Sequence, residues 1–120
     1  MKVAVCGVNN IKLLNKVENH YNVKSVATIG SIYELAKATY EYDNVVDVVF
    51  NGCVLDGIVN VDNIHPFDEQ IVLCALDNID VVYVYTNGMT TEDINRYHQF
   101  DEFYPTKIVD VENVDTFVLK

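Results

Sequence analysis

Basic residues are scarce in this sequence. Among its 120 residues there is one arginine, Arg96, and Lys and Arg together number 8 against 18 Asp and Glu, for a formal net charge of −10. Proteins that bind nucleic acids need clustered Lys and Arg to displace the counterions of the phosphates. The composition therefore argues against a nucleic-acid partner.

Cysteines and long apolar runs are also few. Cys6, Cys53 and Cys74 are an odd number without paired spacing, which is typical of reduced cytosolic thiols and not of a secreted disulfide framework. No apolar run approaches the roughly 18–20 residues that span a bilayer, and the strand-like start is too short for a signal peptide. We therefore expect a cytoplasmic protein with no membrane role.

Apolar residues, in contrast, make up 50% of the chain. A chain of this length buries roughly 60–70% of its unfolded surface, so a core can form without disulfides or a metal. Disorder is not expected at this apolar content. We predict one domain over residues 1–120.

The charge is unevenly distributed along the chain. Residues 1–40 hold five lysines against two glutamates, giving +3, whereas residues 41–120 hold three bases against sixteen acids, giving −13. Residues 38–95 contain no Lys or Arg. Two interpretations are open, a solvated acidic surface or an acidic docking face for a basic partner.

Four apolar runs predict strands, because each is rich in Val, Ile or Tyr and ends in a glycine. Runs without polar alternation are typical of parallel strands that are covered on both faces. A glycine at the end lets the chain turn towards a following helix. The runs are Val3–Gly7, Val26–Gly30, Val48–Gly52 and Val81–Gly88.

The segments between these runs predict helices. In the first, Asn9 or Asn10 is the expected cap, and Lys12 and Lys16 face outward. In the second, Ser31 and Glu34 form a capping box. The apolar positions expected to face inward are Leu13, Leu14, Val17 and Tyr21 in the first helix and Ile32, Leu35, Ala36 and Thr39 in the second.

Two further helices follow. The third opens at Pro66 and has an apolar body, Ile71–Leu76; the fourth is capped by Thr90 or Thr91 and turns Ile94 and Tyr97 to the core. A last strand is expected near Lys107–Val111. Residues 114–119 fit a strand or a short helix, and we favour a strand. Alternating strands and helices predict a three-layer α/β/α sandwich with a mainly parallel five-stranded sheet, of the flavodoxin- or Rossmann-like kind.

In such sheets ligands bind beyond the carboxyl ends of the strands. Two interpretations of this edge are open, ordinary turn and cap residues or a site for an anion or nucleotide. The loop of thirteen residues at Cys53–His65 also lies there. The candidate ligand-binding residues are Gly7, Val8, Asn9, Asn10, Asn51, Gly52, Thr86, Asn87 and Gly88.

Other chemistries have less support in the sequence. Asn9 and Lys12 replace glycines of the dinucleotide-binding motif, so we expect no NAD or FAD. Cys53, Asp56 and His65 lack an oxyanion signature, and the three histidines lack metal-ligand spacing. We predict no catalytic residue, no metal and no cofactor, although enzymatic activity stays open.

The succession of elements, with Asp47–Gly57 and Val81–Thr86, resembles a response-regulator receiver domain over roughly residues 1–111. The resemblance implies that Thr86 corresponds to the hydroxyl that senses phosphate. Asn51 stands in place of the aspartate that accepts it, and no acidic pair for magnesium follows the first strand. Lys107 precedes the fifth strand where receivers have a lysine at its end. The resemblance thus implies a degenerate receiver, similar to those fused to pilus-assembly and partition-type ATPases, that does not take phosphate.

A second resemblance concerns Lys2–Gly7 and Ile79–Gly88, which are similar to strands of small nucleoside deoxyribosyltransferase-like domains. It implies an enzyme with a carboxylate nucleophile on a strand-to-helix turn, a position that no acid clearly occupies. The end of the chain at Phe117–Lys120, without a receiver's terminal helix, is compatible with a domain of a longer protein.

The function we favour from the sequence is a non-catalytic, receiver-like interaction and regulatory module, whose partner is a protein or a second copy. Its expected interface is an apolar patch on the third helix, formed by Val72, Leu73 and Leu76. One alternative is a small nucleotide- or nucleoside-binding domain or enzyme. Another is an acidic inhibitor of phage or mobile-element type, which occupies a basic groove.

Overall fold

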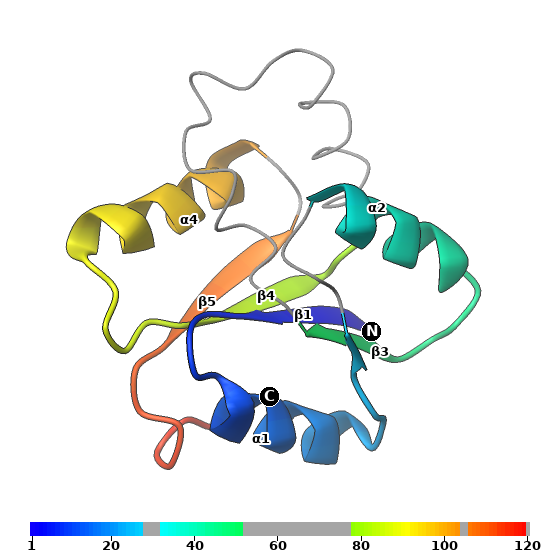
Figure 1. The fold of residues 1–120 in the computed structure, drawn as a ribbon, viewed down its shortest axis with the longest axis horizontal. Coiled ribbons are helices and arrows are strands. Elements are labelled where there is room, and N and C mark those ends of the chain that lie inside the picture. Colours follow the sequence, from blue (N-terminus) through cyan, green and yellow to red (C-terminus); the bar gives the residue numbers. More distant parts are fainter. Residues whose placement is uncertain (28–31, 52–77, 104–105, 120) are drawn as a thin grey trace.

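A computed structural model describes residues 1–27, 32–51, 78–103 and 106–119 (Figure 1). It confirms an α/β fold with a parallel sheet. The strands match the expected runs, except that β2 is described over two residues only. In chain order the elements are β1 (Lys2–Cys6), α1 (Ile11–Tyr21), β2 (Val26–Ala27), α2 (Ile32–Glu41), β3 (Val48–Asn51), β4 (Val81–Tyr85), α4 (Thr91–Phe103) and β5 (Lys107–Val111).

Among the described residues all strand pairs are parallel, and the strand order is β2-β3-β1-β4-β5. Four strands of four or five residues form its body, and β2 adds a two-residue pair at one edge. The central strand is β1: Val5 is paired with Asn51 of β3 on one side and with Tyr83 of β4 on the other. The carboxyl end of β1 therefore lies between those of β3 and β4.

This order differs from the flavodoxin-like order β2-β1-β3-β4-β5, which receivers share. Both orders place β1 beside β3, but here β4 is paired with β1 and not with β3. The chain succession of the elements is the same in the two cases. Because parallel buried strands have similar sequences, the apolar runs predict the strands and not their spatial order.

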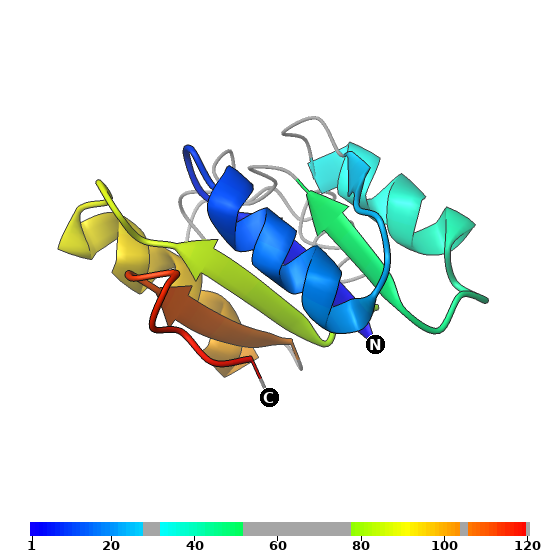
Figure 2. The ribbon, with the colours of Figure 1, turned by 90° about the horizontal axis from the view of Figure 1, so that it is seen from below.

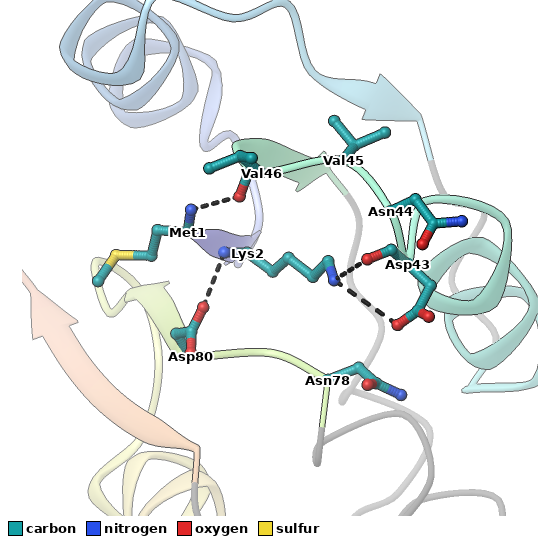
Figure 3. A pocket seen from close by; sticks show the side chains of 8 residues that line it. All are labelled: Met1, Lys2, Asp43, Asn44, Val45, Val46, Asn78 and Asp80. Carbon is teal, nitrogen blue, oxygen red and sulfur yellow. Dashed lines mark hydrogen bonds and ion pairs between the residues drawn. The ribbon is translucent and has the colours of Figure 1, made fainter.

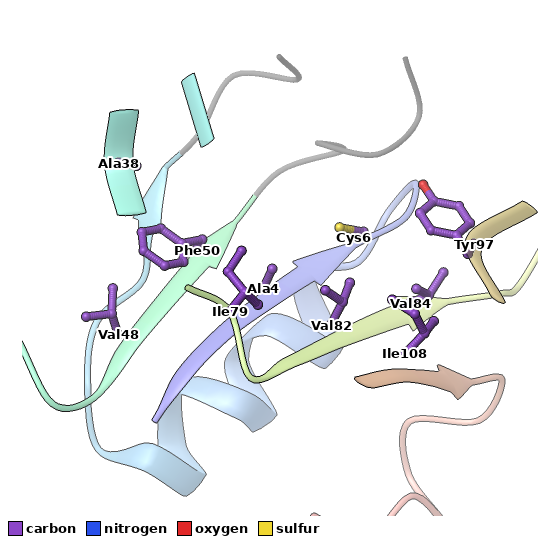
Figure 4. Close-up of a cluster of buried hydrophobic side chains, with 10 residues drawn as sticks. All are labelled: Ala4, Cys6, Ala38, Val48, Phe50, Ile79, Val82, Val84, Tyr97 and Ile108. Atoms are coloured by element: carbon purple, nitrogen blue, oxygen red, sulfur yellow. The ribbon is translucent and has the colours of Figure 1, made fainter. Parts of the chain in front are cut away.

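Alternation along the strands divides the core between the two faces of the sheet. On one face, Val3 and Val5 of β1 pack with Leu13, Leu14 and Val17 of α1. On the other, Ala4 and Cys6 belong to a cluster with Ala38 of α2 and Tyr97 of α4 (Figure 4). Figure 2 shows α1 in front of the sheet and α2 and α4 behind it. We call the first of these the α1 face.

Two helix starts differ in how they are capped. At α1 the cap residue is Asn10, as expected, but its side chain makes no capping hydrogen bond. At α4 the Thr90 hydroxyl accepts the backbone N–H of Asp93 at 3.2 Å, and Glu92 and Asp93 lie in the first turn. The start of α4 is therefore stabilised in two ways: the threonine hydroxyl accepts a backbone amide that has no partner in the helix, and the acids oppose the positive end of the helix dipole.

The expectation of a strand over residues 114–119 is wrong. The segment forms a turn in which the Asn113 side-chain oxygen accepts the backbone N–H of Asp115 at 3.0 Å and the Asn113 carbonyl accepts that of Phe117 at 3.2 Å. Asparagine readily forms such local bonds, which compete with a strand ladder. We call residues 112–119 the C-terminal segment.

Several predictions fall outside the described residues. They concern the capping residue Ser31, the end of the second run at Gly30, the loop Cys53–His65 with Asp56, the helix from Pro66, Cys74, Gly52, and the patch of Val72, Leu73 and Leu76.

Candidate functional site

The carboxyl edge of the sheet brings together the ends of β1 and β4. Gly7 has φ +114, and a Cβ at this position would lie 2.6 Å from the Tyr85 carbonyl oxygen. Only glycine lets the two chains approach this closely. The residues Gly7–Asn10 and Thr86–Gly88 therefore follow neighbouring strands at one edge, with Asn51 on the other side of β1.

The turn from β1 into α1 carries an exposed apolar side chain and a residue in the left-handed conformation. Val8 is 66% exposed, and Asn9 has a left-handed φ of 56. The Asn10 amide donates back to the Val5 carbonyl at 3.4 Å. No acidic residue lies in the first turn of α1. The first backbone amides of this helix therefore receive no side-chain cap from Asn10, and uncapped amides at a helix start are chemically suited to bind an anion.

Thr86 is hydrogen-bonded to β5 through both its backbone and its side chain. Its backbone N–H donates to the Val111 carbonyl at 3.0 Å, its hydroxyl donates to the same carbonyl at 3.4 Å, and the residue is buried. Asn87 is exposed and donates to the Tyr85 hydroxyl at 3.2 Å. The hydroxyl expected to sense a ligand therefore helps to hold the end of β4 against β5.

A polar hollow of 530 Å³ lies at this edge, and among the described residues that line it Asn87 is the one predicted as a site residue. Two of its lining residues, Lys12 and Asp115, form an ion pair with their charged atoms 2.7 Å apart, and both side chains are largely exposed. The Lys12 ammonium, by its hydrogen bond and its charge, lowers the pKa of Asp115 below the usual value. The remaining lining residues are Tyr85, Glu112, Asn113 and Val114.

An apolar groove of 610 Å³ lies on the α1 face, over β4 and β5. The α1 helix covers β1 with its apolar stripe, and the C-terminal segment runs along β5 on the same side (Figure 2). The residues that line the groove are mostly aromatic or aliphatic, and the carboxylate of Asp110, one of its two charged residues, is bonded to His98 of α4. The lining residues are Met1, Tyr21, Val81, Tyr83, Lys107, Ile108, Val109, Asp110, Phe117 and Val118.

Two tyrosines fix the floor of this groove. Tyr83 is 6% exposed; burial, and next a hydrogen bond with Tyr21, strongly raises its pKa. The Tyr21 hydroxyl in turn donates to the Met1 sulfur at 3.3 Å. Phe117 packs edge-to-face on Tyr83, with ring centroids 5.7 Å apart. Rigid aromatic side chains of this kind are common at binding surfaces.

The C-terminal segment forms one wall of the groove and is held by α1. The Lys16 ammonium donates to the Val114 carbonyl at 2.6 Å and also to the Phe117 carbonyl. Val114 is buried, whereas Val118 is 75% exposed. Lys16, which the sequence places on an outer helix face, thus connects two distant parts of the chain.

At the opposite, amino edge a polar hollow of 370 Å³ is surrounded by a bonding network (Figure 3). The Lys2 backbone N–H donates to the Asp80 carboxylate at 2.9 Å, and its ammonium donates to the Asp43 carbonyl at 2.9 Å. The Met1 ammonium lies 2.6 Å from Asp47 and donates to the Val46 carbonyl. These acids fasten the start of β1 between those of β3 and β4.

The sequence did not predict the groove, because its residues come from four distant parts of the chain. One available signal is that Val81, Tyr83 and Tyr85 alternate along β4. Tyrosines at alternate positions indicate a face that keeps hydroxyl groups within reach of solvent or partners.

The remaining observations concern metal binding, the contact between α4 and β5, and membrane spans in the part of the chain that the structure describes. No group of three or more His, Cys, Asp and Glu there could hold a metal ion. His98 of α4 contacts both carboxylate oxygens of Asp110 at 2.8 Å, which links α4 to β5. No described helix has the length and apolar character needed to cross a membrane.

Comparison with protein-family models, curated proteins and solved structures finds no significant match to the chain.

Proposed function

We propose that this chain is a non-catalytic protein-interaction module that docks a partner on the α1 face of β4 and β5. The apolar groove over these strands carries the proposal. A cavity of 610 Å³ with apolar walls and a few polar groups has the size and character of binding sites. Exposed apolar surface with aromatic anchors is also a mark of protein interfaces.

The fold interpretation that accompanies this proposal is a three-layer α/β/α domain of the flavodoxin- or Rossmann-like kind with a rearranged strand order. The proposal rests on the groove and not on the receiver resemblance, since β1 separates β3 from β4. It includes the absence of phosphorylation, because Asn51 at the end of β3 offers an amide where a receiver has its aspartate. Acetyl phosphate with magnesium should therefore give no thermal shift.

Position-specific photo-crosslinking tests the docking face. A benzoylphenylalanine replaces Val118 at the groove or, as the control, Val46 at the amino edge; both valines are more than 70% exposed. In an extract of the source organism, position 118 should cross-link one discrete protein that position 46 does not. Light scattering of the purified chain separates a second copy from another protein. Identical cross-linking at both positions, or none at 118, contradicts the proposal.

A second candidate function is nucleotide or nucleoside binding at the carboxyl edge. The uncapped start of α1, without an acidic first turn, favours it. Thermal-shift screening against nucleotides, nucleosides and sugar phosphates tests it. Asn9→Gly removes a side chain without straining the left-handed backbone, and Asn87→Ala removes another. Saturable stabilisation that these variants abolish supports this function, and no stabilisation by any compound rejects it.

A further inference from the structure

The C-terminal segment already occupies part of the proposed docking face. Val114 is buried against the α1-face core, and Phe117 and Leu119 pack on the same cluster. The segment is neither a helix nor a strand, so no ladder of backbone bonds ties it to the sheet. Side-chain packing and the bonds to Lys12 and Lys16 therefore hold it on this face.

The chemistry of the segment is that of an acidic amphipathic chain. Its apolar side chains meet the sheet, its Asp115 carboxylate meets Lys12, and two of its carbonyls meet Lys16. The same pattern, apolar residues on one side and acceptors and acids towards α1, is what an external occupant of this face would need.

The cations around this face are complementary to such a chain. Lys12 and Lys16 of α1 lie on one side, and Lys107 lines the groove at the start of β5. The Lys107 ammonium has no partner among the described residues. Although the whole chain carries −10, residues 1–40 carry +3, and the α1 lysines belong to that part. Repulsion from distant acids is screened beyond about 8 Å at physiological salt.

We propose that the α1 face of β4 and β5 binds an acidic amphipathic helix of a protein partner, and that the C-terminal segment is its intramolecular competitor. This inference rests on the proposed function and specifies the partner's chemistry and the regulation of the site. When the partner's helix binds, residues 112–119 give up their place over β4 and β5 but stay joined to Val111 at the end of β5, so that position 118 remains beside the partner. Lys12 and Lys16 then pair with the partner's acids.

The length and direction of the helix follow from the sheet. Five residues of β5 extend about 16 Å, which equals about 11 helical residues, the length of α1 on the same face. A helix that runs antiparallel to β4 and β5 points its carboxyl end towards Lys107. The negative end of the helix dipole then meets this cation.

A synthetic peptide tests the proposal on the full chain. The probe is a fluorescein-labelled helical peptide with leucines at alternating spacings of three and four and glutamates elsewhere. The control peptide has lysine in place of each glutamate. Fluorescence anisotropy at near-physiological salt should show saturable binding of the glutamate peptide only.

Two variants break the same ion pair from opposite sides. Asp115→Asn removes the ion pair that holds the C-terminal segment to Lys12 and leaves every cation in place. The glutamate peptide should therefore bind roughly two- to fivefold more tightly, the change in affinity expected when one exposed ion pair is lost. Lys12→Met also loosens the competitor but removes a cation that the peptide uses. The Lys12→Met variant should bind the glutamate peptide no more tightly than the unaltered chain does.

Each part of the proposal is contradicted by a different result of these experiments. Equal peptide affinities for Asp115→Asn and the unaltered chain overturn the competition. Binding of the lysine peptide alone overturns the acidic partner but leaves the docking face. If neither peptide binds any variant, including Phe117→Ala, the acidic-helix proposal is wrong. In that case the crosslinking at position 118 decides separately whether the face docks a different kind of partner.

Discussion

The backbone of Tyr85 leaves no room for a side chain on Gly7. A Cβ there would lie 2.6 Å from the Tyr85 carbonyl oxygen and 3.0 Å from its Cβ, and the φ of +114 is itself unfavourable for other residues. This contact joins the carboxyl ends of β1 and β4, which are neighbours in the sheet. Gly7 thus permits the close approach of the carboxyl ends of β1 and β4.

Gly7→Ala should lower the free energy of unfolding by roughly 2–4 kcal/mol, the sum of backbone strain and a clash with immobile backbone. The control is Gly88→Ala, where φ is +84 but nothing lies within 4 Å of the added Cβ. That variant should lose only about 1–2 kcal/mol from strain. Urea unfolding measures both, and equal losses would show that the Tyr85 contact is unimportant.

Much of the fold could be predicted because the strands are apolar runs that end in a glycine or a polar residue. β5 lies where it was expected, and the α1 stripe of Leu13, Leu14 and Val17 is buried. The spatial order of the strands could not be predicted, since it depends on which strands pair and not on their individual sequences. The candidate site residues after β1 and β4 do lie at one edge, but Thr86 is bonded to β5.

The uneven charge has a structural explanation that the sequence could not provide. Lysines of the basic part meet groups of the acidic part: Lys2 bonds to the Asp43 carbonyl, and Lys12 pairs with Asp115. Lys16 bonds to carbonyls of the C-terminal segment. These contacts join residues at least 41 positions apart, beyond the reach of local patterns. Part of the charge asymmetry is therefore matched within the molecule.

The Asp80 carboxylate holds the start of β1 against β4 by accepting the Lys2 backbone N–H. Asp80→Ala should lower the free energy of unfolding by about 1 kcal/mol, the usual worth of a hydrogen bond. Asp80→Asn keeps an acceptor oxygen and should lose less than half as much. Chemical denaturation of the two variants compares them, and an equal loss would mean that the carboxylate charge, not the hydrogen bond, matters.

The C-terminal segment should loosen in acid, because Lys12 lowers the pKa of Asp115. A carboxyl whose pKa is lowered by folding contributes stability above its unfolded pKa, and this stability is lost as the pH falls through the folded pKa. Hydrogen exchange of the segment's amides should therefore lose protection below about pH 4, relative to the amides of β1. In Asp115→Asn this step should be absent. A step that persists in the variant would assign it to another carboxyl group.

Tyr83 should make the fold sensitive to alkali. Burial and the hydrogen bond with Tyr21 raise the pKa of its hydroxyl, so the neutral form is favoured in the folded state. A group whose folded pKa is raised stabilises the fold fully below its unfolded pKa, near 10, and this stability is lost as the pH rises towards the folded value. The free energy of unfolding should thus decline above about pH 10.

The Tyr83→Phe variant should lose about 1 kcal/mol of unfolding free energy at neutral pH and show a shallower alkaline decline. Tyr40→Phe, at a tyrosine that is 84% exposed, is the control and should keep the full slope. Urea titrations between neutral pH and pH 11 measure both variants, and parallel curves for the two would exclude Tyr83 as the source of the decline.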